Sequence, residues 1–235
     1  MTSASNGIVH IRRKDLKLVK KIGEGGYGTV YHMIWKRDGD HGNNGKDDED
    51  VIHVAAKKQY KVDHSELEVL SKLKHVNIVG LIGVIPEEID FMLILELCKS
   101  GSLRNHLDRC GQEPLPKELF CRWSKDAARA IQYLQDMKVV HKDVKSDNYL
   151  VSGSDHPDGE GTVLKLADFG LAKTIEKTVS GATQRGSWAY MAPELLIDCT
   201  LSPTKLDIYA YGVVLWEMLT GKIPYDGMVR KFITS

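Results

Sequence analysis

An eight-residue polar stretch, 141–148, constrains this chain more than any other part of its sequence. It reads His-Lys-Asp-Val-Lys-Ser-Asp-Asn, follows a segment with helical apolar spacing, and precedes the apolar pair Tyr149 and Leu150. So many polar side chains do not suit a buried strand, and the stretch therefore predicts a loop. Because this loop presents a carboxylate, an ammonium and a carboxamide at fixed offsets, it can handle a proton, a transferring phosphate and a metal ion. A solvated polar turn is the alternative.

The composition limits the kind of protein. The 235 residues suffice for one large domain or two smaller lobes, and 32 basic residues balance 32 acidic ones. A net charge near zero argues against a nucleic acid or an anionic membrane as the main partner. The four cysteines lack C-x-x-C spacing, which favours free thiols in a reducing compartment. Since there is neither a signal core in residues 1–7 nor an apolar run long enough to span a membrane, we expect a cytoplasmic protein.

The first half of the chain carries mostly strand patterns. We expect residues 1–14 to form a flexible lead, and the turn-rich residues 36–50 to form a disordered loop. The acidic residues of that loop lack the spacing of a calcium-binding loop. Alternating or continuous apolar runs predict strands, and apolar residues at helical spacing predict one helix. The strands are expected over 15–35 as a hairpin, 51–59, 78–85 and 91–97, and the helix over 64–74.

The expected hairpin contains the glycine-rich run 23–28, Gly-Glu-Gly-Gly-Tyr-Gly. Glycines allow backbone amides to approach phosphate oxygens without an intervening side chain. A single G-x-G-x-x-G run is weak evidence, because it also marks dinucleotide-binding folds. Those folds require a helix directly after the glycines, whereas a strand-like run, 29–35, follows here. A hairpin lying over a nucleotide is therefore favoured.

Two charged residues of the first half are predicted to form a pair. The spacing of the expected helix places Glu66 on the same face as Val69 and Leu70, so this carboxylate is expected to be buried. A buried carboxylate needs a partner, and Lys57 on the preceding strand is the natural one. The alternatives are a surface lysine and an acid that complements the helix dipole.

The second half is mainly helical in pattern. A long helix is expected from Pro116 to about Leu134 and another over 204–220, with a strand at 163–166. Asp168, Phe169 and Gly170 directly follow that strand, after a polar hairpin loop at 152–161. The segment 171–187 is rich in hydroxyls and precedes Ala192-Pro193-Glu194. Its hydroxyls are Thr174, Thr178, Ser180, Thr183 and Ser187.

Six motifs in this order, over residues 15 to about 228, resemble the protein kinase family. The resemblance implies an α+β, bilobal fold with an antiparallel N-lobe sheet, one N-lobe helix and a mostly helical C-lobe. Residues 15–98 correspond to the N-lobe, with the insert loop 36–50, and residues 99–235 to the C-lobe. The family continues with further helices after Tyr225, so we expect the C-lobe to be incomplete and Glu194 to lack its arginine partner.

The resemblance also implies the site and its ligands, ATP and Mg²⁺. Catalytic roles fall on Asp143 as base, Lys145 at the γ-phosphate, and Lys57 held by Glu66. Metal ligands are Asn148 and Asp168. The nucleotide-binding set is Ile22, Gly23, Glu24, Gly25, Gly26, Tyr27, Gly28, Val30, Ala55, Lys57, Leu95, Glu96, Cys98 and Leu150. Ser187 resembles the hydroxyl that organises the catalytic aspartate and lysine, and Asp207 resembles the aspartate that holds the catalytic loop from below.

Details of the motifs point to a subgroup. Lys145, two residues after Asp143, resembles the serine/threonine-specific form of the loop. The runs 186–194 and 211–218 are most similar to mixed-lineage and leucine-zipper MAP kinase kinase kinases, and next to Raf-type enzymes. A protein substrate, possibly a MAP kinase kinase, is therefore implied. The alternatives are a catalytically impaired pseudokinase that acts as a scaffold, and a dual-specificity or tyrosine kinase. Lys142 replaces the usual arginine, which predicts weaker regulation by loop phosphorylation.

Overall fold

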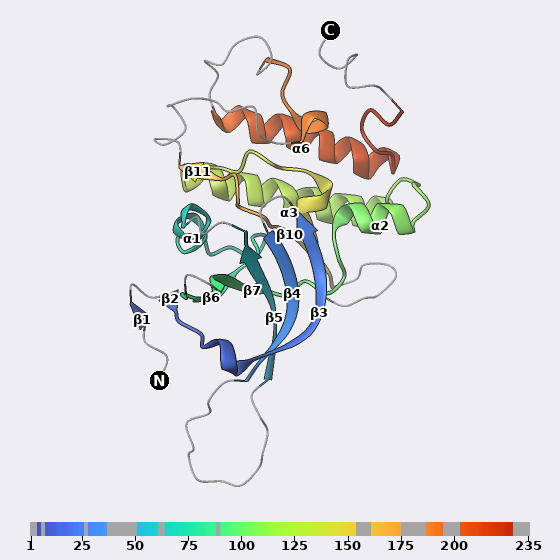
Figure 1. The fold of residues 1–235 in the computed structure, drawn as a ribbon. Coiled ribbons are helices and arrows are strands. Elements are labelled where there is room, and N and C mark those ends of the chain that lie inside the picture. Colours follow the sequence, from blue (N-terminus) through green and yellow to red (C-terminus); the bar gives the residue numbers. More distant parts are fainter. Residues whose placement is uncertain are drawn as a thin grey trace. The chain divides into compact units, whose positions relative to one another are not determined.

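The computed structural model describes residues 4–5, 8–25, 28–36, 51–60, 64–87, 90–153, 161–174, 187–194 and 203–227 (Figure 1). The chain forms two compact units. The first comprises Met1–Ser71 with Gly80–Leu97, and the second comprises Lys72–Val79 with Cys98–Ser235. Several predictions lie outside the described residues. They concern the insert loop over 37–50, the loop tip at Gly26 and Tyr27, most of the loop 152–161, and the hydroxyls Thr178, Ser180 and Thr183.

The first unit is built on a five-stranded antiparallel sheet with the order β3-β4-β5-β7-β6. Figure 1 shows β3, β4 and β5 curving side by side. The strands are β3 (Leu16–Gly25), β4 (Gly28–Lys36), β5 (Val51–Gln59), β6 (Leu81–Ile85) and β7 (Met92–Glu96). A short pair, β1 (Ala4–Ser5) with β2 (Ile8–Val9), and the 3-10 turn η1 (Arg13–Asp15) precede them.

Alternation along the strands places a hydrophobic core on one face of this sheet. Met33 and Trp35 of β4, Val54 and Ala56 of β5, and Ile94 of β7 are all at most 5% exposed. Because side chains alternate along a strand, Ala55 and Lys57 of β5 lie on the opposite face. The sheet therefore presents the predicted functional residues on the face away from this core.

The helix of the first unit is shorter than predicted. α1 spans Ser65–Leu70, not 64–74. Ser71 forms the C-cap: its backbone amide bonds to Leu67 O and its hydroxyl donates to Glu68 O. The strand expected from residue 78 likewise begins only at Leu81. The residues before it, 72–79, belong to the second unit, where Ile78 forms a bridge with Leu166.

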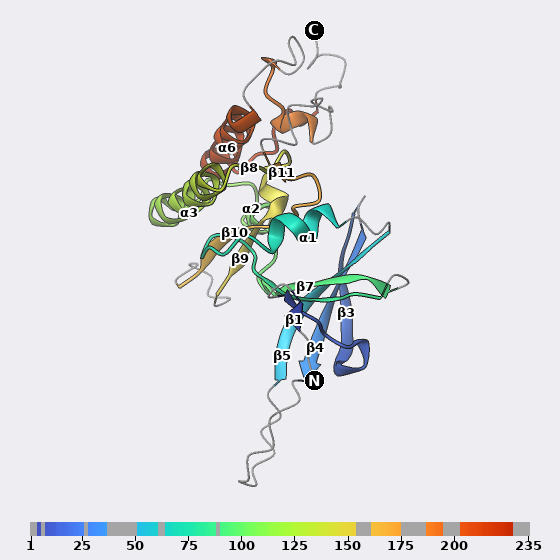
Figure 2. The ribbon, with the colours of Figure 1, turned by 90° about the vertical axis from the view of Figure 1, so that its left-hand side faces the viewer.

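The second unit is mainly helical. Figures 1 and 2 both show α3 (Lys117–Asp136) and α6 (Pro203–Thr220) running next to each other. α2 (Leu103–Arg109) starts after Ser102, whose side chain forms a capping box with Asn105. The smaller elements are β8 (Val139–Val140) paired with β11 (Lys173–Thr174), β9 (Tyr149–Ser152) paired with β10 (Val163–Leu166), and the 3-10 turns η3 (Ser146–Asn148) and η4 (Trp188–Tyr190).

α3 packs against β9 and β10. Its Trp123 is fully buried and donates to Thr162 Oγ1 at 3.1 Å, and its Asp126 accepts the Leu164 amide at 3.1 Å. These two polar contacts fix the start of β10 relative to the helix, so that the residues after β10 have a defined position. No helix in the described ranges is long and apolar enough to cross a membrane. The α+β prediction is confirmed by the five-stranded sheet and the helical second unit.

Candidate active site

The glycine-rich run forms the tip of the β3–β4 hairpin. Glu24 pairs with Thr29 and Gly25 with Gly28 across the two strands. Gly28 lies so close to the end of β5 that an added Cβ would sit 2.2 Å from the Lys58 carbonyl oxygen. Only glycine fits this approach, which explains one of the three glycines in the motif. Ile22, Gly23 and Val30 lie on the same hairpin.

The ion pair between Lys57 and Glu66 is present and buried. Lys57 Nζ lies 2.7 Å from Glu66 Oε1 and 2.8 Å from Oε2. Gln59 Nε2 donates to the same carboxylate at 3.0 Å. The two charged side chains are 7% and 2% exposed, so each supplies a neutralising charge to the other inside the first unit. The pair joins β5 to α1 and holds the ammonium at one position.

The residues expected near a nucleotide base divide between the units. Ala55 pairs with Leu95, and Val54 with Glu96, in the β5–β7 ladder of the first unit. Cys98 and Leu150 belong to the second unit, where Leu150 forms a bridge with Ser102. The register thus brings Ala55 and Leu95 together as cross-strand neighbours.

The predicted catalytic loop brings its reactive side chains together in the second unit. Lys145 Nζ donates to Asp143 Oδ2 at 2.8 Å and to Ser187 Oγ at 3.0 Å. The Ser187 hydroxyl donates to Asp143 Oδ1 at 3.2 Å. A carboxylate, an ammonium and a hydroxyl therefore form a closed triangle, although Ser187 is 44 positions from Asp143. Such an arrangement can orient an alcohol, accept its proton and stabilise a phosphoryl group.

Asn148 fits the role of a magnesium ligand. Its Nδ2 donates to Asp143 O at 2.7 Å and to Asp143 Oδ2 at 3.0 Å, so the orientation of the amide is fixed and Oδ1 is the atom left for a cation. The other candidate, Asp168, directly follows Ala167, whose amide donates to Asn148 O at 2.8 Å. Carboxylate and amide oxygens are the hard ligands that Mg²⁺ prefers, with water and phosphate completing its shell.

The catalytic loop is held from α6. Asp207 Oδ2 accepts the His141 amide at 2.7 Å, and Oδ1 accepts the Lys142 amide at 2.9 Å. Burial raises the pKa of Asp207, and His141 and its amide oppose that rise. The His141 ring bonds to Ala167 O at 3.0 Å and packs edge-on against Phe169. One anchor therefore connects the loop, the segment at 167–169 and α6.

Two non-glycine residues beside these groups have left-handed backbones. Lys142 has a φ of 69° and Asp168 a φ of 61°. This region is disfavoured for side chains with a Cβ, at a cost of roughly 1–3 kcal/mol for each residue. The surrounding hydrogen bonds of Asp207 and Ala167 hold both conformations in place.

The sequence reasoning missed a buried network around Glu217. This glutamate is fully buried and accepts from Ser146 Oγ at 2.7 Å, Tyr190 Oη at 3.0 Å and Arg104 Nη1 at 3.2 Å. Burial raises the pKa of Glu217. The signal was available, because Glu217 shares the spacing of the buried residues Asp207, Ala210 and Val214 on α6.

Comparison with known proteins gives one family match and several relatives. The sequence profile of a family described as protein tyrosine and serine/threonine kinase matches residues 16–234. Mitogen-activated protein kinase kinase kinase 13 of Mus musculus and of Homo sapiens, and mitogen-activated protein kinase kinase kinase 12 of Rattus norvegicus, are each 37% identical over 172 residues. The match covers 73% of this chain but only 17%, 17% and 18% of the relatives' own lengths. The matched region is thus about a sixth of each relative.

Proposed function

We propose that this chain, which belongs to the protein tyrosine and serine/threonine kinase family, transfers the γ-phosphate of ATP to a serine or threonine of a protein substrate. The observation that carries the proposal is the triangle of Asp143, Lys145 and Ser187, because it combines a base, a cation and an orienting hydroxyl. Nothing in a purely structural turn requires these three groups to meet.

The residues of the second unit supply the chemistry. Asp143 orients the substrate hydroxyl and accepts its proton, while the Lys145 ammonium stabilises charge on the transferring phosphoryl group. Asn148 and Asp168 would hold magnesium. When bound, the ion neutralises charge on the phosphates. The bonds from Asn148 to Asp143 support these assignments, because they fix the base and the amide relative to each other.

The residues of the first unit hold the nucleotide. Lys57, oriented by Glu66, would hold the phosphates of ATP, and the hairpin amides of Gly23, Gly25 and Gly28 would be available to bind phosphate oxygens. By resemblance, the backbone of the segment from Glu96 to Cys98 would bind the adenine, and Ala55 would lie against its ring.

The substrate class is inferred from resemblance alone. Lys145 matches the serine/threonine form of the loop, and the relatives named above are MAP kinase kinase kinases. A MAP kinase kinase is therefore the first protein to test as substrate.

The test compares purified wild-type protein with Asp143→Asn in a radiolabel transfer assay with magnesium ATP. We expect the variant to lose transfer by about three orders of magnitude or more and to remain folded, as judged by a cooperative urea transition. Asp136→Asn, at the end of α3, is the matched control and should transfer normally. ATP binding without turnover by the wild type would favour a pseudokinase. Phosphotyrosine among the products would overturn the serine/threonine assignment.

A further inference from the structure

The hydroxyl of Tyr60, the residue directly after β5, contacts both arms of the glycine hairpin. Tyr60 Oη donates to Glu24 Oε1 at 2.8 Å, across 36 positions of sequence, and lies 3.2 Å from Thr29 Oγ1. The single phenol proton is used in the bond to the carboxylate, so the Thr29 hydroxyl is the donor to Tyr60. Because Glu24 and Thr29 are opposite each other in the β3–β4 ladder, one side chain joins the two strands beside the loop tip.

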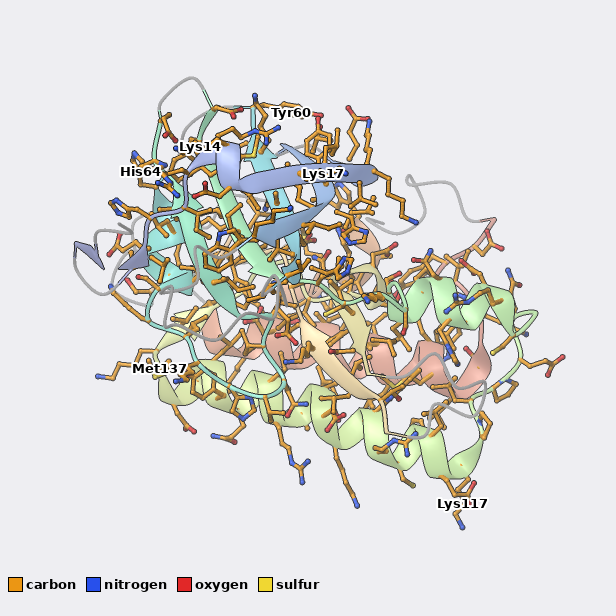
Figure 3. The ribbon with its side chains drawn as sticks, turned by 90° about the horizontal axis from the view of Figure 1, so that it is seen from below. Lys14, Lys17, Tyr60, His64, Lys117 and Met137 are labelled. Atoms are coloured by element: carbon orange, nitrogen blue, oxygen red, sulfur yellow. The ribbon has the colours of Figure 1, made fainter. Side chains whose placement is uncertain are left out.

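The second oxygen of the same carboxylate is also held. Lys21 Nζ forms an ion pair with Glu24 Oε2, so both oxygens of Glu24 have cationic or hydrogen-bonding partners. Tyr60 itself is 57% exposed and lies at the margin of the first unit (Figure 3). Its aromatic ring therefore contributes little to the core, and its exposed position leaves the hydroxyl contacts as its main structural role.

The backbone supports the same contact. The β4–β5 register pairs Gly28 with Gln59 and Thr29 with Lys58. Gly28 also lies very close to the Lys58 carbonyl, so the hairpin packs against the end of β5. Gln59, the neighbour of Tyr60, bonds to Glu66. The end of β5 thus contacts the hairpin through Tyr60. Through Gln59, it also contacts Glu66, the ion-pair partner of Lys57.

We propose that Tyr60 is a positioning residue that fixes the glycine hairpin through Glu24 and Thr29 and thereby raises the affinity for ATP. The part concerning ATP rests on the proposed function, while the part concerning the hairpin does not. A loop that is ordered before its ligand arrives loses less conformational freedom on binding. The effect should appear in the KM or Kd for ATP and not in kcat at saturating ATP, since the hydroxyl touches none of the reacting groups.

The first experiment needs no activity. Tyr60→Phe keeps the ring and removes only the hydroxyl, and hydrogen exchange is measured on the nucleotide-free full chain. We expect faster exchange at amides 23–25 and 28–30 and no change in α3. Tyr133→Phe is the matched control, because it removes a hydroxyl that binds the Lys74 amide in the second unit. Equal hairpin exchange in wild type and Tyr60→Phe overturns the proposal.

The second experiment measures the Kd for ATP and the steady-state constants of the same variants. Tyr60→Phe should weaken ATP binding by about threefold to tenfold, with kcat unchanged within about twofold. Faster exchange together with an unchanged Kd overturns the part that concerns ATP. If the wild type neither binds nor turns over ATP, the proposed function fails, and the exchange result alone decides the role of Tyr60.

Discussion

Asp207 and His141 lie 66 positions apart, yet the carboxylate of one accepts the backbone amide of the other at 2.7 Å. The second oxygen accepts the amide of Lys142, so a single α6 side chain accepts the first two backbone amides of the catalytic loop. The position of the reactive loop therefore depends on a helix that contributes none of the reacting groups.

Asp207→Ala should destabilise the protein, because the buried His141 amide and the part-buried Lys142 amide lose their acceptor. We expect the free energy of unfolding to fall by about 2–6 kcal/mol, at about 1–3 kcal/mol for each unsatisfied group. Asp207→Asn retains one acceptor oxygen and should cost about half as much. Urea denaturation followed by tryptophan fluorescence measures both. The exposed Asp226→Ala is the control, and an equal midpoint for Asp207→Ala and wild type would contradict the anchoring role.

Because Lys57 and Glu66 form a buried ion pair, we expect substitutions of the two residues to have non-additive effects on stability. Glu66→Leu leaves the buried Lys57 ammonium without the Glu66 carboxylate and should cost about 3–5 kcal/mol of stability. Lys57→Met together with Glu66→Leu removes both charges, so stability should recover while phosphotransfer stays absent. A double-mutant cycle by urea denaturation, combined with the transfer assay, checks this. Additive stability losses would show that the two side chains do not depend on each other.

Ser187 offers a test of the catalytic triangle. Ser187→Ala removes one hydrogen bond to the Asp143 carboxylate and one from the Lys145 ammonium. Bonds to charged groups contribute about 1.5–3 kcal/mol, so kcat should fall by about ten- to a hundredfold. Ser187→Thr keeps the hydroxyl and should recover most of the rate. The Kd for ATP, measured by titration calorimetry, should be the same in all three proteins, and a changed Kd with normal kcat would argue against this role.

The glycine hairpin should respond to acid. The pKa of Glu24 is lowered below its ordinary value of 4.5, mainly by the hydrogen bond from Lys21 and then by the hydrogen bond from Tyr60. The contact is therefore fully formed above about pH 4.5, and is lost as the pH falls through the lowered pKa and the carboxylate takes up a proton. Carbon-detected NMR titration of the Glu24 side chain should show a midpoint below 4.5. Lys21→Met should raise that midpoint more than Tyr60→Phe does. A wild-type midpoint at or above 4.5 would refute the contact.

Much of the fold follows from short-range patterns in the sequence. Alternation along Met33, Trp35, Val54 and Ala56 predicts the sheet and its buried face, and the α3 stripe from Trp123 to Leu134 predicts the long helix. The helix around Glu66 was predicted too long, because the apolar spacing continues to Leu73 although the helix ends at Leu70. Leu73, which lies beyond the end of the helix, is nevertheless buried.

The site was predictable where a motif fixes residues at set spacings and unpredictable where it depends on tertiary contacts. Asp143, Lys145 and Asn148 lie within six residues, and the structure brings them together. Tyr60 has no motif around it and meets Glu24 only because the β4–β5 register places the end of β5 beside the hairpin. Glu217 meets Tyr190 and Arg104 through three separate segments, which no local spacing encodes.

The left-handed backbone of Lys142 also bears on protein engineering. A lysine in this conformation pays a steric penalty that a glycine avoids, while the amide that binds Asp207 is common to both. Lys142→Gly is thus a candidate for a more durable variant for crystallography or inhibitor screening. This backbone angle identifies a position beside a reactive carboxylate where glycine would remove a steric cost.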